Sequence, residues 1–275
     1  MKTIVISSQP GQLANQLIVY ANFIAFCNEH GIKLKNPSFH RYSSYFEFTQ
    51  NRYQSMIAYR IINYLMRFLN RFGLENRLIN VVNIGFEDVM SLDDVRSLSV
   101  FRGIINLAAG WKFRGNQTLI KHKKLVLEKL WPCENHMKAI DDFFTSNKLI
   151  NRIVIGIHVR RGDYKNFEGG KYFYDFTEYK KIIKSIALLF KGYNPIFLIC
   201  SNDIDFEKNL NDLNCTVVFG PGHELRDLYC FSRCNYLIGP PSTFTMWASF
   251  VGNVPLCMVK DTKMNICIDD FNVIE

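Results

Sequence analysis

Two adjacent arginines, Arg160 and Arg161, follow a segment, residues 153–159, whose side chains are almost all apolar. His158 lies near the end of this segment, and Asp163 follows the arginines. A guanidinium group presents a planar fork of N–H donors that matches phosphate oxygens, and it stays charged at any working pH. Ligands of open parallel sheets bind just outside the carboxyl ends of the strands. The pattern therefore predicts an anion site here, although the arginines could also be surface charges, one of them paired with Asp163.

Three other segments could bind a ligand in the same way. Residues 11–16 (Gly-Gln-Leu-Ala-Asn-Gln) form a glycine turn that enters a helix, where free N–H groups and the helix dipole favour negative charge. Residues 201–203 (Ser-Asn-Asp) and residues 239–245 (Gly-Pro-Pro-Ser-Thr-Phe-Thr) each follow an apolar strand. Their side chains could cap the next helix or line a cleft. In a parallel sheet, all of these turns would converge on one edge.

The elements that must position these residues follow from the spacing of apolar side chains. In the first half we expect a strand at 2–8, a core-facing helix from residue 13, a strand at 32–34, a loop or cleft wall at 40–53, and helices at 54–72 and 119–130. The region between these last two helices has no readable pattern.

From residue 152 onward, strands and helices alternate regularly. The predicted strands are 153–159, 195–200, 215–219, 235–239 and 254–259, and the predicted helices are 177–190, 204–210, 224–233 and 243–251. Such alternation favours a parallel, doubly wound sheet. We therefore predict an α/β protein with two Rossmann-like domains, residues 1–140 and 150–275, whose parallel sheets face a central cleft.

Composition narrows the class of protein. The chain has 275 residues, of which 48% are apolar, so it can bury one or two cores. No apolar stretch reaches the roughly 20 residues that span a bilayer, and no leader pattern precedes the first strand, so we expect a cytoplasmic protein. Most of the eight cysteines lie within predicted strands and helices, which is typical of reduced core thiols.

The formal charge of +8 favours anionic partners. The basic runs at 121–124 and 180–181 lack the interleaved aromatic residues of a nucleic-acid platform, so nucleic acid is not expected as a partner. No nucleophile elbow, Walker loop or His-Glu-x-x-His motif is present, and no metal site is implied.

Four segments together resemble those of the α-1,2-fucosyltransferases (glycosyltransferase family eleven) and of the related α-1,6- and protein O-fucosyltransferases. Residues 158–163 look like the His-x-Arg-Arg-x-Asp motif of that group, and residues 11–16 like its Gly-x-x-Gly-Asn-Gln segment. Residues 201–203 resemble its middle motif, and residues 242–248 look like its Ser-(Ser/Thr)-Phe-Ser-x-Trp-Ala motif. The resemblance implies a two-domain GT-B architecture, GDP-β-L-fucose as the donor, no metal or other cofactor, and inversion to an α-linked fucoside.

The resemblance also implies roles for single residues. Arg160 would hold the β-phosphate, with His158 and Arg161 beside it, and Asn15 would face the fucose. Asp227 and His223 are the candidates for binding guanine. The remaining candidates for donor binding are Gln12, Ser201, Asn202, Ser242, Thr243 and Phe244.

An arginine at the β-phosphate is chemically apt because the departure of GDP concentrates negative charge there. Inverting transfer also needs a group that accepts the proton of the acceptor hydroxyl. The sequence does not identify this base. Asp163 could serve, but we favour a role for it in anchoring the arginine loop, and Glu168 and Asp175 are alternatives. Arg160, Asp163 and Asn15 are thus the catalytic candidates.

The implied partners are GDP-fucose and a glycan acceptor, either a galactose-terminated oligosaccharide or a lipid-linked glycan of surface polysaccharide. The latter is compatible with peripheral association at the inner face of the membrane. The sequence departs from the family at Ala14, where glycine is usual, and at Pro240 and Pro241, where polar residues are usual. Another GDP-sugar, another linkage and a non-catalytic nucleotide-binding role therefore stay open as alternatives.

Overall fold

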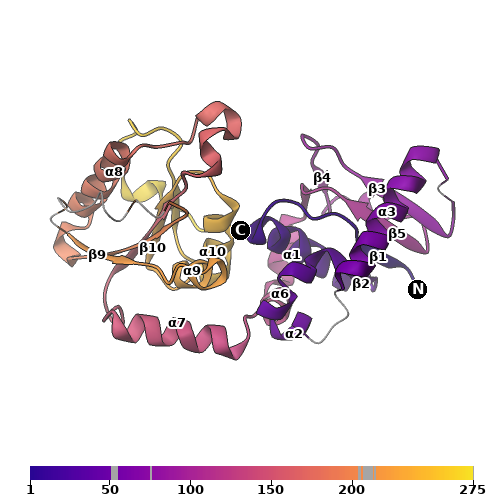
Figure 1. Ribbon diagram of the computed structural model, residues 1–275, viewed down its shortest axis with the longest axis horizontal. Helices are drawn as coiled ribbons and strands as arrows, with labels where there is room; N and C mark the ends of the chain where they lie inside the picture. The colour runs from indigo at the N-terminus through magenta and orange to yellow at the C-terminus, as the bar shows by residue number, and fades with distance from the viewer. Residues whose placement is uncertain (51–54, 75, 204–205, 207–212, 214, 275) are drawn as a thin grey trace. The chain divides into compact units, whose positions relative to one another are not determined.

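Parallel strands form the centre of both units into which the chain divides, Met1–Glu134 and Asn135–Glu275 (Figure 1). The computed structural model describes residues 1–50, 55–74, 76–203, 206, 213 and 215–274. Within these ranges, no helix combines the length and the apolar character needed to cross a membrane.

The first unit has a parallel four-stranded sheet in the order β2-β1-β5-β3. Its strands are β1 (Thr3–Ile6), β2 (Lys33–Lys35), β5 (Ile105–Ala109) and β3 (Ile79–Asn83). A separate two-stranded parallel sheet pairs β4 (Met90–Ser91) with β6 (Phe113–Arg114). The helices are α1 (Leu13–Glu29), α2 (Glu47–Gln50), α3 (Met56–Phe72), α4 (Ser97–Val100), α5 (Asn116–Lys121) and α6 (Lys123–Lys129), with short 3₁₀ turns at Pro37–Arg41 and Ser43–Tyr45.

Helix α1 is the central helix of the first unit, because it is apolar on nearly every side and is buried from Leu13 to Cys27 except at two positions. A helix that is apolar all round must be covered on all sides. Its buried Asn22 is satisfied at both ends of its amide, since Nδ2 donates to the carbonyl of Ile18 at 2.8 Å and Oδ1 accepts from the N–H of Gly115 at 2.6 Å.

Strands β3 and β5, which pair with each other in the core of this sheet, were not predicted from the sequence. Each of these short strands contains a buried asparagine, Asn80 or Asn106, which interrupts the apolar pattern. Nδ2 of Asn80 donates to Oδ1 of Asn106 at 3.3 Å and to the carbonyl of Val100 at 2.9 Å. The hydrogen bonds of these buried amides are satisfied by residues outside their own strands. The local sequence therefore gives little indication of the two strands.

Two other expectations for the first unit need correction. The predicted helix at 119–130 is two helices, α5 and α6, which meet at His122. The predicted loop at 40–53 contains the 3₁₀ turns and α2, and its residues 51–54 lie outside the described residues. The predicted helix at 54–72 is confirmed as α3.

The second unit has a parallel five-stranded sheet in the order β11-β10-β7-β8-β9. Its strands are β7 (Val154–Val159), β8 (Ile196–Ser201), β9 (Thr216–Phe219), β10 (Tyr236–Gly239) and β11 (Leu256–Met258), and its main helices are α7 (Glu134–Ser146), α8 (Phe176–Leu189), α9 (Glu224–Phe231) and α10 (Thr243–Gly252). The predicted strands and the helices that became α8, α9 and α10 are confirmed. The predicted helix at 204–210 lies outside the described residues except for Phe206.

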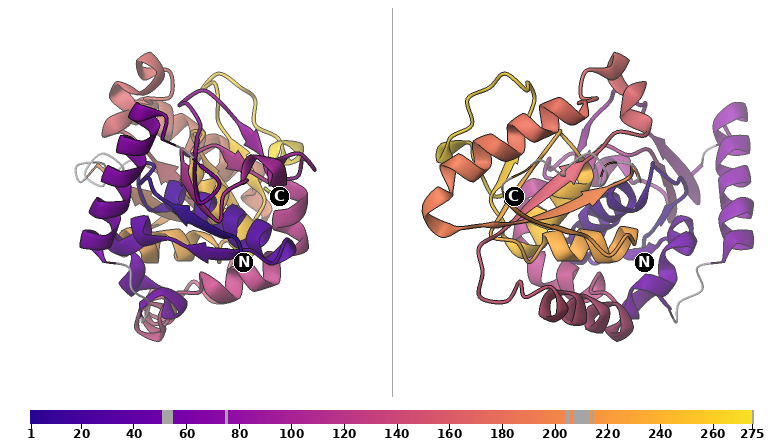
Figure 2. Two further views of the ribbon diagram at one scale, coloured as in Figure 1. Left: turned by 90° about the vertical axis from the view of Figure 1, so that its right-hand side faces the viewer. Right: turned by 60° about the vertical axis from the view of Figure 1, so that its left-hand side comes forward.

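Alternate residues of β7 face opposite sides of this sheet, and α8 covers one side while α9 and α10 lie on the other (Figures 1 and 2). Ile155, Ile157 and Val159 join one core cluster with residues of α8. On the opposite side, an added Cβ at Gly156 would meet the Phe231 ring of α9 at 2.8 Å. The central strand is therefore buried on both faces, as parallel sheets require.

Candidate functional site

The topology of the second unit creates a switch point between β7 and β10. From β7 the chain proceeds to β8 and β9 on one side, and it then returns to place β10 and β11 on the other. In open parallel sheets, ligands bind at such a point, beyond the carboxyl ends of the strands. The arginine loop after β7 and the turn into α10 after β10 are the two segments that meet there.

Ring stacking and close backbone packing join these two segments. The His158 ring stacks on the Phe244 ring of α10 at 5.1 Å between ring centres, with 23° between the planes. An added Cβ at Gly239 would lie 2.9 Å from both the Cβ and the carbonyl oxygen of His158. The Tyr164 hydroxyl donates to the carbonyl of Pro241 at 2.6 Å. Two segments about 80 residues apart along the sequence are thus tied together.

His158 itself is uncharged in this position. Its side chain is buried, and burial, together with the neighbouring Arg160 guanidinium, lowers the pKa of His158 to about 3. Among the described residues, Nδ1 has no hydrogen-bond partner. The ring therefore supports the base of the site as a neutral, stacked group and cannot supply positive charge near neutral pH.

Arg160 is held by the residues of its own loop. Its Nη2 donates to Oδ2 of Asp163 at 2.7 Å, and its guanidinium carbon lies 5.6 Å from the centre of the Tyr164 ring. The backbone N–H of Arg160 donates to the Tyr179 hydroxyl of α8 at 3.0 Å. Asp163 is more than half exposed, whereas the Arg160 side chain is largely covered. This geometry supports the anchoring role that we favoured for Asp163.

Arg161 faces a different set of partners. Its Nε lies 2.9 Å from Oδ2 of Asp203, and its guanidinium carbon lies 3.8 Å from the centre of the Phe176 ring. Its backbone N–H donates to Oδ1 of Asn202 at 2.9 Å. An ion pair and an aromatic face thus position this arginine, so the two arginines of the motif are not equivalent.

The polar residues after β8 stabilise the arginine loop. Asn202 accepts the Arg161 N–H, and an added Cβ at Gly162 would lie 2.7 Å from Nδ2 of Asn202. Ser201 makes a local turn in which its Oγ accepts from the N–H of Asp203 at 2.9 Å. The helix that this segment could cap lies outside the described residues, so capping and lining the site both stay predictions.

The N-terminus of α10 has the polar cap expected of an anion-binding helix. Oγ of Ser242 accepts from the N–H of Phe244 at 3.2 Å, and Oγ1 of Thr245 donates to the carbonyl of Ser242 at 3.0 Å. Thr243 is the first helical residue and is partly exposed. The helix dipole places partial positive charge at this end, beside the arginine loop.

Asp227 lies in the first turn of α9, the helix that follows β9, and α9 packs against α10. Its carboxylate is buried, and Oδ1 accepts from the N–H of Gly222 at 3.0 Å. Burial raises the pKa of Asp227 to about 6, although hydrogen bonds from the backbone of Gly222 and His223 partly oppose this rise. A buried acid of this kind retains acceptor capacity for a further donor.

His223 is the cap of α9, since its Nδ1 accepts from the N–H of Leu225 at 3.2 Å. Its ring lies 5.2 Å from the ring of His136 on α7. Burial and the nearby Arg226 lower the pKa of His223, so the ring is neutral when it serves as a cap. The structure thus places both candidates for base binding, His223 and Asp227, at the start of α9.

Gln12 and Asn15 belong to the first unit, where they lie at the start of α1 beyond the carboxyl end of β1. Gly11 has a φ of 55°, and an added Cβ there would overlap the Asn15 amide. Nε2 of Gln16 donates to the carbonyl of Gly11 at 3.3 Å. The turn therefore requires glycine at position 11 and presents Asn15 half-buried at the helix start.

Three aromatic residues that support the loop escaped the sequence analysis as site residues: Tyr164, Phe176 and Tyr179. Tyr179 is almost fully buried and occupies a core-facing position of α8, which in sequence is typical of any packed helix. The hydrogen bond between its hydroxyl group and the backbone N–H of Arg160 cannot be predicted from the local sequence. Tyr164 follows the arginine motif directly, and this position could have singled it out.

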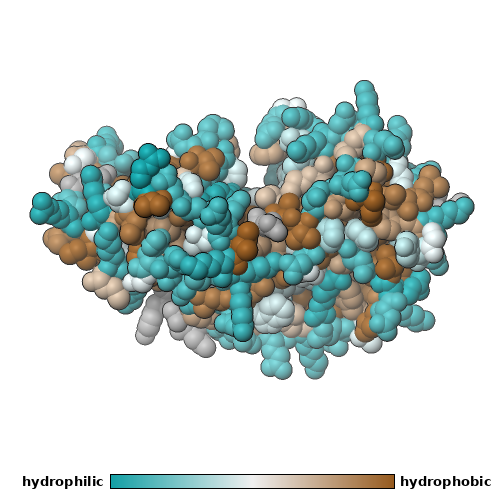
Figure 3. Space-filling view, turned by 180° about the vertical axis from the view of Figure 1, so that it is seen from behind, coloured by the Kyte–Doolittle hydropathy of each residue, from teal (hydrophilic) through white to brown (hydrophobic). Residues whose placement is uncertain are grey.

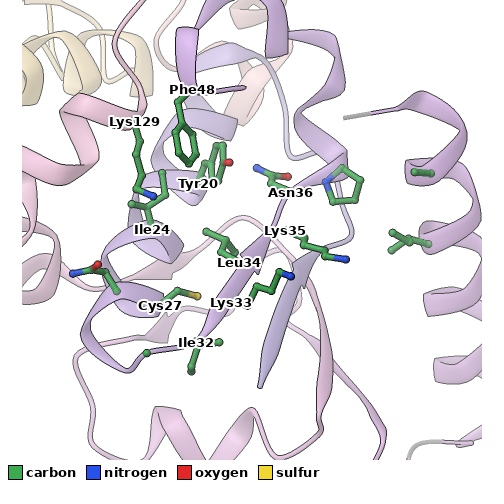
Figure 4. A pocket seen from close by; sticks show the side chains of 15 residues that line it. Tyr20, Ile24, Cys27, Ile32, Lys33, Leu34, Lys35, Asn36, Phe48 and Lys129 are labelled. Atoms are coloured by element: carbon green, nitrogen blue, oxygen red, sulfur yellow. The ribbon is translucent and has the colours of Figure 1, made fainter. Parts of the chain in front are cut away.

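The first unit contains a pocket of about 790 Å³ beside its edge strand (Figure 4). Tyr20, Ile24 and Cys27 of α1 line one side, and Lys33 and Lys35 of β2 contribute positive charge. The remaining lining residues that Figure 4 labels are Ile32, Leu34, Asn36, Phe48 and Lys129. None of these residues was predicted from the sequence to be a site residue.

Within the described ranges, no three His, Cys, Asp or Glu side chains come close enough together to hold a metal ion. Positive charge at the switch point comes instead from the arginines and from the N-terminus of α10.

Comparison with known proteins adds to this geometry. Residues 141–263 match the family described as Glycosyl transferase family 11. A bovine (Bos taurus) protein, galactoside 2-alpha-L-fucosyltransferase SEC1, is 27% identical over 110 residues, which are 35% of this chain and 28% of that protein. The chain spans less than half the length of the curated relatives that it matches.

Two solved structures are similar over nearly the whole chain. A mutant of Arabidopsis thaliana FUT1 in complex with GDP has a TM-score of 0.65 at 13% identity and covers 94% of this chain and 70% of that one. The α-1,6-fucosyltransferase NodZ soaked with GDP-fucose has a TM-score of 0.58 at 15% identity and covers 94% and 95% of the two chains. The predicted resemblance to fucosyltransferases and the predicted α/β fold with two Rossmann-like parallel sheets are both confirmed.

Proposed function

We propose that this chain, whose residues 141–263 carry a family 11 glycosyltransferase domain, transfers L-fucose from GDP-β-L-fucose to a glycan hydroxyl, in α-1,2 linkage to galactose. The observation that carries the proposal is that the loop containing Arg160 is joined to the turn before α10 at the switch point of the sheet, by the hydrogen bond from Tyr164 to Pro241. The name of the bovine relative, a galactoside 2-alpha-L-fucosyltransferase, supports galactoside as the acceptor class.

The donor diphosphate would lie across the switch point. Arg160 would bind the β-phosphate, and the N-terminus of α10 with Ser242 and Thr243 would bind the pyrophosphate. Because Arg161 is engaged by Asp203 and Phe176, it would position the loop and add to the positive field. Phe244 and the neutral His158 would form the floor of the site, with Ser201 and Asn202 at its rim.

The guanine base would extend toward α9. Strand β9 is two positions from β7 in the sheet, a separation of roughly 10 Å that a nucleoside diphosphate can span. Guanine offers N1–H and N2–H donors side by side, and a carboxylate such as Asp227 can accept both. Uracil lacks this pair of donors, so this contact would select GDP over UDP.

Catalysis would come from stabilising the leaving group. As the bond between fucose and the β-phosphate breaks, negative charge gathers on the GDP oxygens and an oxocarbenium-like sugar forms. A guanidinium group fixed at those oxygens stabilises that charge without a metal ion. Asn15 and Gln12, which lie at the start of α1, stay predictions as donor-binding residues.

The first test is a calorimetric titration of the purified chain with GDP, GDP-fucose, GDP-mannose and UDP, with EDTA present. We expect binding of GDP and GDP-fucose and none of UDP. Incubation with GDP-fucose and lactose should then give a fucosylated product whose linkage is read by NMR. The absence of a guanine preference would overturn the donor, and binding without transfer to any galactoside would point to the non-catalytic alternative.

A further inference from the structure

Helix α3 in the first unit has well-defined ends. Oγ of Ser55 accepts from the N–H of Ile57 at its start, and Gly73 ends it in the left-handed conformation with a φ of 61°. Nδ2 of Asn63 donates to the carbonyl of Ser7 at 2.9 Å, which attaches the helix to the end of β1. These contacts fix the rotation of the helix, and therefore which side chains face outward.

The inner face of α3 packs on the sheet. Ile62, Met66 and Leu69 contact a core cluster that includes Val5 of β1 and Leu107 of β5. These three helix residues recur at intervals of four and three, which is the period of one helix face. This face alone therefore packs α3 against the core.

A second apolar row runs along the outward side, which we call the outer ridge. It consists of Ile57 (68% exposed), Ile61 (63%), Tyr64 (73%), Leu65 (37%), Phe68 (41%) and Phe72 (58%). Single exposed apolar residues are ordinary, and the face of the protein in Figure 3 shows hydrophobic residues interspersed with hydrophilic ones. Six of them on one face of one helix form a continuous patch, which marks a binding surface.

Positive charge accompanies the outer ridge. Arg60, Arg67 and Arg71 are spaced by seven and four residues, so they form one stripe along its flank. Helix α3 contains no Asp or Glu. The pocket behind α3, which Ala58 and Ile62 help to line, contains lysines and no acidic residue.

We propose that the outer ridge of α3 docks the first unit onto a bilayer that contains anionic lipids. The apolar side chains would enter the boundary between headgroups and acyl chains, and the arginine stripe would lie at the lipid phosphates. A second copy of the chain is a poorer occupant, because α3 offers no acidic group to meet the arginines of the other copy. This proposal does not depend on the proposed transferase activity.

Vesicle co-sedimentation of the full chain tests this. We expect the protein to sediment with vesicles of phosphatidylcholine and phosphatidylglycerol and to stay in the supernatant with phosphatidylcholine alone. The double substitution Ile61→Asp, Phe68→Asp should abolish sedimentation. The triple substitution Arg60→Gln, Arg67→Gln, Arg71→Gln should lower the partition coefficient roughly five-fold for each arginine, about a hundred-fold in all.

Matched controls lie on α8 of the second unit. Leu188 is 73% exposed there, and Lys181 and Lys184 are exposed lysines of the same helix. Leu188→Asp and the pair Lys181→Gln, Lys184→Gln should leave sedimentation unchanged, and melting temperatures should show that every variant folds. Equal loss in the α3 and α8 variants would overturn the proposal. So would a concentration-dependent dimer, seen by light scattering, that the α3 double variant alone dissociates.

Discussion

The backbone N–H of Arg161 donates to the side-chain oxygen of Asn202 across 2.9 Å, and this bond joins the loop after β7 to the segment after β8. Strands β7 and β8 are neighbours in the sheet, and His158 is paired in register with Cys200. The conformation of the arginine loop therefore depends on a residue about 40 positions further along the chain, and this dependence can be tested.

Asn202→Ala removes the acceptor of the Arg161 N–H and should loosen the arginine loop. Because loss of a single hydrogen bond in a partly exposed loop costs about 1 kcal/mol, the fold should survive. We expect the KM for the donor to rise while the melting temperature falls only slightly. A donor titration of kcat and KM checks this, with Asn166→Ala as a control in the same loop region. An unchanged KM would contradict the role assigned to Asn202.

Arg160→Ala should lower kcat by roughly a hundred- to a thousand-fold, because the charge that develops on the leaving GDP loses its main partner. Arg160→Lys should recover only part of the rate, since an ammonium group cannot present two parallel donors. Arg152→Ala, at an exposed position of the same unit, serves as the control. A rate for the Arg160→Ala variant within a few-fold of the wild type would remove the central argument for the proposed function.

Asp227→Asn should raise stability at neutral pH while weakening GDP binding. The folded-state pKa of about 6 lies above the unfolded value of 3.8, so the folded protein holds this proton more tightly. Stability due to this group is thus present below about pH 4 and is lost as pH rises through 6. The Asp227→Asn variant does not suffer this loss, so its free energy of unfolding at neutral pH should be higher by at most about 3 kcal/mol. Thermal unfolding at pH 7.5 should show a raised melting temperature, and the gain should shrink near pH 4.

The same pKa predicts how GDP binding depends on pH. Only the ionised carboxylate of Asp227 can accept both guanine donors, so GDP affinity of the wild type should fall as pH drops below about 6. Calorimetry between pH 5 and pH 8 checks this, with pyrophosphate as the reference ligand that lacks a base. A fall of equal size for pyrophosphate would place the titrating group elsewhere. His158 will not contribute, because its pKa is about 3.

Gly239→Ala should destabilise the second unit and reduce activity together. The glycine has an ordinary φ, so the expected cost comes from overlap of the new methyl group with the backbone of His158 and not from backbone strain. Overpacking of this kind costs about 1–3 kcal/mol. Chemical denaturation measures the loss. Gly192→Ala is the control, since an added Cβ at Gly192 meets nothing within 4 Å.

The sequence could predict much of the second unit because its signals are local. Strands such as Val154–Val159 are continuous apolar runs, and the polar residues that follow them are visible without any knowledge of tertiary contacts. Parallel topology then places those residues on one edge. The first unit was harder to predict, because Asn80 and Asn106 interrupt the apolar pattern of β3 and β5 and are satisfied only by distant partners.

The division of labour between the two arginines could not be predicted. Arg160 and Arg161 are adjacent and chemically identical, and only the folded loop shows that one pairs with Asp163 and the other with Asp203. The outward face of α3 was hidden for a related reason. Its helical period is readable, but the spacing of apolar residues does not say which of the two apolar rows meets the sheet.

The return of the chain from β9 to β10 also has a consequence for the order of assembly. During synthesis β7, β8 and β9 emerge first, and until residues 236–239 follow, β7 is an edge strand with unpaired backbone groups on one side. The switch point forms only when β10 pairs with β7. A nucleotide bound across β7 and β10 would therefore hold the first strand of this sheet to one of the two strands that are added last. It would protect the second unit from unfolding while leaving the exchange of amide hydrogens in the first unit unchanged.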